Sequence, residues 1–89
     1  MKEEIKASIH NYITWGYPPG DFLESVLTND LSGAFGHGDS QNVADLREII
    51  QYLNAACPRA ARGTAGQVRA WCRGGGSAGR RRTLLCEAI

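Results

Sequence analysis

Long apolar stretches are missing from this chain of 89 residues. No apolar run approaches the roughly 18 residues that a membrane-spanning helix needs. The first four residues, Met1 to Glu4, are mostly charged, and no apolar segment of the kind found in a secretory signal peptide follows them. We therefore expect a cytoplasmic protein that does not contact a membrane.

Cysteine is scarce, with Cys57, Cys72 and Cys86 as the only three. An odd number cannot close a complete disulfide framework. No two of them form a CxxC pair, and the two histidines lie far from them in sequence, which is not typical of a structural zinc site. We interpret Cys57 and Cys72 as small apolar residues of the interior.

Catalytic signatures are also missing. His37 precedes Asp39 by two residues, but no GxSxG or Cys-His pattern accompanies this pair. The glycines at 74–76 lack the lysine and the strand-to-helix context of a phosphate-binding loop. The sequence therefore predicts a protein that is not an enzyme and that needs no cofactor and no metal.

Charge is unevenly distributed behind a formal net charge of +1. Residues 1–53 hold three basic and eight acidic side chains, whereas residues 54–89 hold seven arginines and one acid, Glu87. This pattern indicates an acidic body with a basic C-terminal part. The arginines either contact nucleic acid or an acidic protein, or they are solvated and pair with the acidic half.

Apolar residues recur at spacings of three and four, and no alternating strand pattern is present. The spacing predicts helices over about 2–15, 22–35 and 65–73, and a further helix that begins after Asp39 or Ser40 and runs to about 56. Four short helices with brief loops predict an all-α fold, a small bundle within a single domain of residues 1–73. A thin core of this size leaves homo-oligomerisation open.

Local signals mark several helix ends. Gly16 can supply the left-handed residue that terminates the first helix, and Pro18-Pro19 prevents its continuation. Thr64 and Gln67 have the spacing of a capping box at the start of the last helix.

Asp30 interrupts the apolar stripe of the second expected helix, beside Leu27 and Leu31. A buried carboxylate has to be paired or hydrogen-bonded. We therefore expect Asn29 or Asp30 to cap another element, either the turn at 17–20 or the start of the third helix. The alternative is that Asp30 points to water.

The C-terminal part begins with the Gly-rich sequence 74–79 and continues with Arg80-Arg81-Arg82 and an apolar end at 83–89. A Gly-rich segment has little side-chain surface to pack, so ordering it is entropically unfavourable. We expect a flexible Gly/Arg-rich tail over 74–89. In the alternative, Leu84, Leu85 and Ile89 dock on the bundle or on a second subunit.

Several motifs occur in one order: G-Y-P-P-G-D-F-L at 16–23, N-D-L at 29–31, A-F-G at 34–36, then Asp39 and Asn42. In this pattern the chain resembles a family of small proteins that recurs in phage and prophage genomes. The resemblance covers about residues 8–73 and departs from the family at 59–62 and after 74. It implies an accessory phage protein that acts in the cytoplasm of the bacterial host.

The resemblance, the small size and the acidic N-terminal half together suggest a non-enzymatic inhibitor of a host defence system. An anti-CRISPR protein that binds a defence effector is the leading hypothesis, because an acidic face can mimic nucleic acid. The alternatives are an oligomeric sponge for a nucleotide signal and a small phage regulatory or nucleic-acid-binding protein. The candidate partner-binding residues are Asp21, Glu24, Asp30, Asp45, Glu48, Arg80, Arg81 and Arg82.

Two simpler interpretations stay open. The five acids could form an ordinary solvated surface. Direct DNA binding by the segment 42–53 is disfavoured, because Asp45 and Glu48 outweigh Arg47 on the helix that would approach the phosphates.

Overall fold

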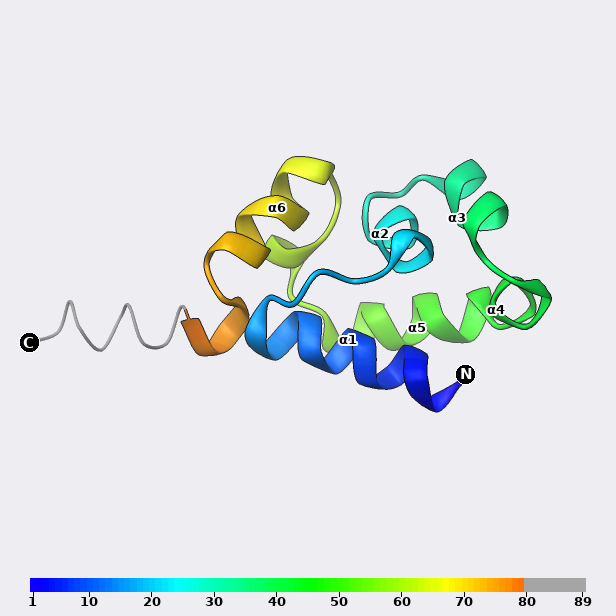
Figure 1. Cartoon of the computed structure of the whole chain (residues 1–89), viewed down its shortest axis with the longest axis horizontal. Helices are drawn as coiled ribbons and strands as arrows, with labels where there is room; N and C mark the ends of the chain where they lie inside the picture. The colour runs from blue at the N-terminus through cyan, green and yellow to red at the C-terminus, as the bar shows by residue number, and fades with distance from the viewer. Residues whose placement is uncertain (80–89) are drawn as a thin grey trace, which may run out of the picture.

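The computed structural model describes residues 1–79, which are helical with no strand among them. The all-α prediction is confirmed for this part of the chain. The helices are short and are joined by turns and brief loops (Figure 1). In chain order they are α1 (Glu3–Trp15), α2 (Asp21–Leu27), α3 (Leu31–His37), α4 (Ser40–Ala44), α5 (Leu46–Ala56), the 3-10 turn η1 (Arg59–Ala61) and α6 (Ala65–Arg73).

Helix α1 agrees with the expected first helix. Glu3 and Glu4 lie in its first turn, where negative charge stabilises the positive end of the helix dipole. The helix ends at Gly16, which has φ of 73° and donates its N–H to the carbonyl of Tyr12 at 3.0 Å. The predicted left-handed stop at Gly16 is therefore confirmed.

The single helix expected over 22–35 is wrong, because the chain breaks between Leu27 and Leu31. Asn29 adopts φ of 62°, a left-handed conformation that its short polar side chain tolerates better than most. The Asp30 carboxylate then accepts a hydrogen bond of 3.0 Å from the N–H of Gly33. Asp30 is exposed and caps α3, a helix that the sequence pattern did not separate from α2, so the expectation that it caps the turn at 17–20 or the third helix is wrong.

The third expected helix is also divided, into α4 and α5, with the break at Asp45. Asp45 has φ of −89° and ψ of 1°. It is the C-cap residue of α4 and the N-cap residue of α5. The predicted N-cap at Asp39 is confirmed, since its carboxylate accepts the N–H of Asn42 at 2.8 Å.

The last expected helix agrees with α6. The Thr64 hydroxyl accepts the N–H of Gln67 at 3.1 Å, which confirms its role as the N-cap. Between α5 and α6, Pro58 opens η1 in an extended conformation.

The core is built mainly from the faces of α1, α2, α5 and α6. Two polar groups inside it are satisfied by backbone carbonyls across long sequence separations. The Tyr12 hydroxyl donates to the carbonyl of Ala61 at 2.5 Å, and the indole N–H of Trp71 donates to the carbonyl of Tyr12 at 2.9 Å. The buried apolar residues are Ile9, Tyr12, Phe22, Leu23, Leu27, Ala34, Leu46, Ile49, Leu53, Cys57, Ala61, Val68 and Trp71.

Residues 74–79 follow α6 and pack against the end of α1. A Cβ atom on Gly16 would lie 2.7 Å from the backbone nitrogen of Gly76, so the two backbones approach more closely than any side chain allows. Residues 76–79 are helical, so the flexible tail expected from residue 74 onward is not confirmed for 74–79. The expected interactions of Arg80-Arg81-Arg82 and of the segment 83–89 lie outside the described residues.

Candidate functional site

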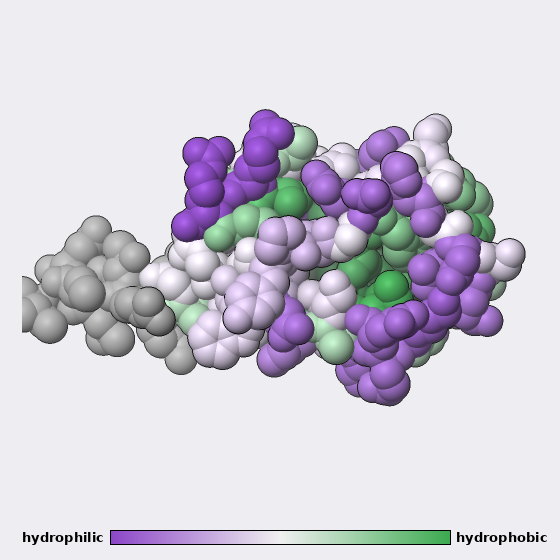
Figure 2. Space-filling view, in the orientation of Figure 1, coloured by the Kyte–Doolittle hydropathy of each residue, from purple (hydrophilic) through white to green (hydrophobic). Residues whose placement is uncertain are grey.

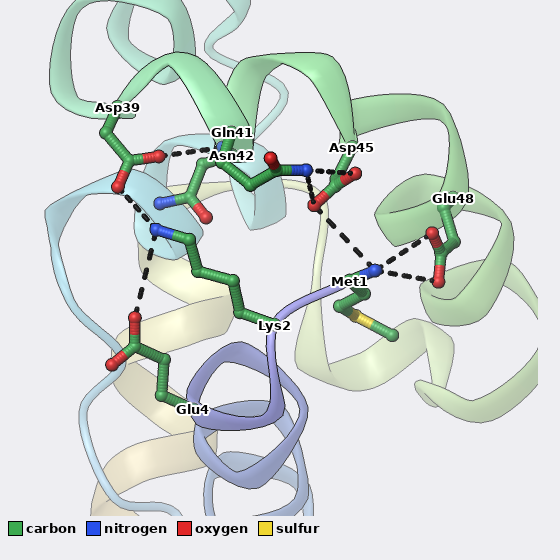
Figure 3. A network of polar contacts seen from close by, with 8 residues as sticks. All are labelled: Met1, Lys2, Glu4, Asp39, Gln41, Asn42, Asp45 and Glu48. Carbon is green, nitrogen blue, oxygen red and sulfur yellow. Dashed lines mark hydrogen bonds and ion pairs between the residues drawn. The ribbon is translucent and has the colours of Figure 1, made fainter.

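Two of the five candidate acids, Asp45 and Glu48, meet at the start of α5. The amino group of Met1 lies 3.0 Å from the Glu48 carboxylate and 3.7 Å from that of Asp45 (Figure 3). The hydrogen bond that this amino group donates to the Glu48 carboxylate is the largest cause that raises its pKa, although desolvation opposes it. These two carboxylates are thus engaged by the N-terminus.

A second ion pair lies in the same network, between Lys2 and Asp39 at 2.5 Å (Figure 3). The hydrogen bond from Lys2 lowers the pKa of the Asp39 carboxyl, and the N–H of Asn42 adds to this effect. The hydrogen bond to Asp39 in turn raises the pKa of Lys2. Asp39 was predicted only as a helix cap, and it also ties α1 to the start of α4.

The other three candidate acids lie elsewhere. Asp21 and Glu24 belong to the first turn of α2, and Glu24 lines a shallow hollow shared with Pro18, Pro19 and α6. Asp30 lies at the junction of α2 and α3. Within residues 1–79 the five acids are therefore spread over three places, and only Asp45 and Glu48 share an ion-pair partner, the amino group of Met1. Arg80, Arg81 and Arg82 lie outside the described residues.

An open groove of about 470 Å³ lies between the α2–α3 junction, α5 and η1. Its walls are largely apolar, and Asp30 is the one acidic residue among them. Arg59 and Arg62 contribute the positive charge. The lining residues are Ser25, Val26, Leu27, Asn29, Asp30, Leu31, Ala34, Leu46, Ile50, Leu53, Asn54, Arg59, Arg62 and Gly63.

Hydrogen bonds between residues far apart in sequence or on neighbouring elements hold the walls of this groove in place. The N–H of Gly63 donates to the carbonyl of Leu27 at 2.8 Å, which joins the loop before α6 to the end of α2. The Asn29 amide reaches the carbonyl of Gly63 at 3.5 Å. On the α5 side, Arg62 donates to the side chain of Asn54 at 2.6 Å. The groove therefore depends on the break in the second expected helix.

Large apolar side chains are exposed in and beside the groove. Leu31 is 64% exposed and Ile50 is 42% exposed, and both line it. Phe35, one helical turn after Leu31 on α3, is 54% exposed. Uncovered hydrophobic surface is also visible between hydrophilic side chains on the face drawn in Figure 2.

Sequence reasoning did not identify the groove. Leu31 was assigned to the apolar stripe of one continuous helix, so it was expected inside. The sequence signal that could have indicated the break between α2 and α3 was the pair Asn29-Asp30, which favours a turn followed by a helix N-cap.

Cys57 is buried and Cys72 is partly buried, and burial is the main cause that raises the pKa of each thiol. Within residues 1–79, no cluster of three or more histidine, cysteine or acidic side chains could hold a metal ion. None of the helices there combines the length and the apolar character needed to cross a membrane.

Comparison of the chain with protein-family models, curated proteins and solved structures gives no match.

Proposed function

We propose that this chain is a binding protein whose groove receives an amphipathic segment of a partner protein. The exposure of Leu31 and Ile50 at the groove is the observation that carries the proposal. A partner helix that lays its apolar face into such a groove removes these side chains from water. Complete burial of one leucine or isoleucine stabilises a complex by about 1.5–3 kcal/mol before the costs of association.

The positive charge of the arginines at the groove indicates the charge that the partner segment carries. Arg59 is exposed at the rim, and neither Arg59 nor Arg62 forms an ion pair within residues 1–79. A carboxylate on the partner segment next to its apolar face complements both arginines. The occupant of the groove is therefore an acidic amphipathic segment of a protein.

The resemblance to small phage proteins supplies the biological setting of this proposal. The partner is then a component of a host defence system, with a CRISPR effector protein as the leading candidate. The chain acts by occupying a surface of that effector and not by catalysis. This mechanism places the main contact at the groove and makes the separate acidic side chains secondary.

The experiment compares phage rescue and effector capture by four proteins. Leu31→Glu and Ile50→Glu place a charge in the groove, whereas Gln51→Glu places the same charge on an exposed residue of α5 outside it. The wild type and Gln51→Glu should rescue phage on CRISPR-positive cells and retain the same effector in a pull-down. The two groove variants should lose both properties while keeping the wild-type circular dichroism spectrum.

Three outcomes contradict the proposal. The first is rescue by the groove variants at the wild-type level. The second is absence of rescue and of a captured effector with the wild type. The third is tight binding of a cyclic nucleotide in calorimetry, undisturbed by Leu31→Glu, which would favour the nucleotide sponge.

A further inference from the structure

Two aromatic side chains are exposed next to the last turn of α6. Trp15 is 48% exposed and Tyr17 is 58% exposed, yet Gly16 between them is buried. A Cβ atom on Gly16 would lie 3.0 Å from the carbonyl oxygen of Cys72. The contact at Gly16 therefore holds the backbone of residues 15–17 against the end of α6, and both aromatic rings are exposed.

Two arginines lie on the same part of α6. Arg69 and Arg73 are one helical turn apart and exposed, and both line a hollow of about 320 Å³ with Pro18 and Pro19. Within residues 1–79 neither arginine forms an ion pair. Their positive charge is thus available to an external anion next to an apolar floor.

The carboxylates of the ion-pair network and the arginines of α6 lie toward different ends of the long axis of the molecule, which measures 49 Å. The N-terminus, α4 and the start of α5 lie toward one end, and α6 lies toward the other (Figure 1). The carboxylates of Asp39, Asp45 and Glu48 belong to the elements at the first end, where they pair with Lys2 and the amino group of Met1 (Figure 3). The α6 end, in contrast, carries Arg69 and Arg73, and strongly hydrophilic side chains project from it in Figure 2.

We propose that the surface formed by Trp15, Tyr17, Arg69 and Arg73 binds single-stranded nucleic acid. Exposed aromatic rings stack on unpaired bases, and nearby arginines contact the phosphates between them. A duplex hides its base faces, so the aromatic residues favour single strands over double strands. This surface is distinct from the groove of the proposed function, and from the segment 42–53 that the sequence disfavoured as a DNA-reading helix.

Glu24 supplies an internal check on the proposal. It is the one carboxylate among the residues that line the hollow, which it shares with Arg69 and Arg73. A negative charge there weakens the attraction of a polyanion. Glu24→Gln should therefore strengthen nucleic-acid binding, an effect that a purely structural role of Glu24 does not predict.

The test is fluorescence anisotropy of the full chain with a labelled oligouridylate or oligothymidylate of about 15 nucleotides. Trp15→Ala and Tyr17→Ala should each weaken binding roughly 5- to 150-fold, the range that corresponds to one lost base stack. Arg69→Gln and Arg73→Gln should each reduce the slope of log K against log salt by about 0.7. Glu24→Gln should raise the affinity at low salt by roughly 1.4- to 5-fold.

Matched controls separate this site from general charge and from the groove. Arg47→Gln removes an exposed arginine next to Glu48 at the other end, and Phe35→Ala removes an exposed aromatic on α3. Both should bind like the wild type. The triple variant Arg80→Gln, Arg81→Gln, Arg82→Gln tests the basic run outside the described residues, and it should reduce the salt slope without removing the effect of Trp15→Ala.

Four results would overturn the proposal. They are no binding at low salt, equal affinity for a duplex of the same length, wild-type affinity in both aromatic variants, and preferential binding of an acidic peptide over the oligonucleotide. Loss of this binding leaves the groove proposal untouched, because Leu31→Glu and Ile50→Glu report on the groove alone.

Discussion

The indole N–H of Trp71 donates a hydrogen bond to the backbone carbonyl of Tyr12, and the Tyr12 hydroxyl donates to the carbonyl of Ala61. Both residues are almost fully buried, Tyr12 at 1% exposure and Trp71 at 3%. Three segments far apart in sequence, α1, η1 and α6, are thus joined inside the core. These two hydrogen bonds hold α6 and η1 against α1.

Removing the Tyr12 hydroxyl should destabilise the protein. Tyr12→Phe leaves the buried carbonyl of Ala61 without this donor, which costs about 1–3 kcal/mol of unfolding free energy. Thermal unfolding should show a fall of about 4–8 °C in Tm for each kcal/mol lost. Tyr52→Phe is the control, since Tyr52 is only half-buried, and its change should stay within about 0.5 kcal/mol. Equal losses in the two variants would contradict the role of this bond.

Asp30 should matter as a helix cap. Asp30→Ala removes the acceptor for the N–H of Gly33 and should cost about 1 kcal/mol, whereas Asp30→Asn retains a capping oxygen and should cost a few tenths at most. Denaturant unfolding of both variants measures the difference. A negligible effect of Asp30→Ala would show that α3 forms without its cap.

The sequence predicted α1 and α6 well because their boundaries are local. Gly16 and Thr64 act within one turn of their own helices, so neighbouring residues suffice to identify them. The break at Asn29 was missed because Leu27 and Leu31 keep the spacing of a continuous helix on both sides of it. Periodicity reports which face is apolar, but it does not report a single left-handed residue.

The groove could not be predicted for a different reason. Its walls meet because Gly63 donates to the carbonyl of Leu27, a contact between residues 36 positions apart in the printed sequence. No local pattern encodes that pairing. The positions of the acidic residues could not be predicted either, because the sequence shows only their charge. In the fold, Asp45 and Glu48 contact the amino group of Met1, whereas Glu24 lies beside α6.

Two glycines should respond to the same substitution with opposite signs. Gly16→Ala puts a Cβ in a left-handed residue, at a cost of about 1–2 kcal/mol, and also 2.7 Å from the nitrogen of Gly76. Gly36 lies inside α3 with no atom within 4 Å of the added Cβ, so Gly36→Ala should stabilise the protein by about 0.5–1 kcal/mol. Thermal melts of the two variants give the comparison. A stable Gly16→Ala variant would mean that the chain after α6 does not pack against α1.

The Lys2–Asp39 pair should make stability depend on acid pH. The pKa of Asp39 is lowered in the folded protein, chiefly by its hydrogen bond with Lys2, so the folded state favours the ionised carboxylate. The resulting stabilisation is present above the carboxyl pKa of the unfolded chain, near pH 4. It is lost as the pH falls through the lower pKa of the folded state.

Lys2→Gln tests this dependence. In this variant an NMR titration should show the pKa of Asp39 rising, while the remaining N–H of Asn42 keeps it below the ordinary value. Unfolding followed between pH 7 and pH 2 should lose less stability than in the wild type, because part of the acid-sensitive interaction is already gone. Lys6→Gln is the control, since Lys6 is exposed on α1 and forms no ion pair within residues 1–79. An unchanged Asp39 titration in Lys2→Gln would show that this exposed pair is not maintained in solution, as screening by water and salt allows for surface ion pairs.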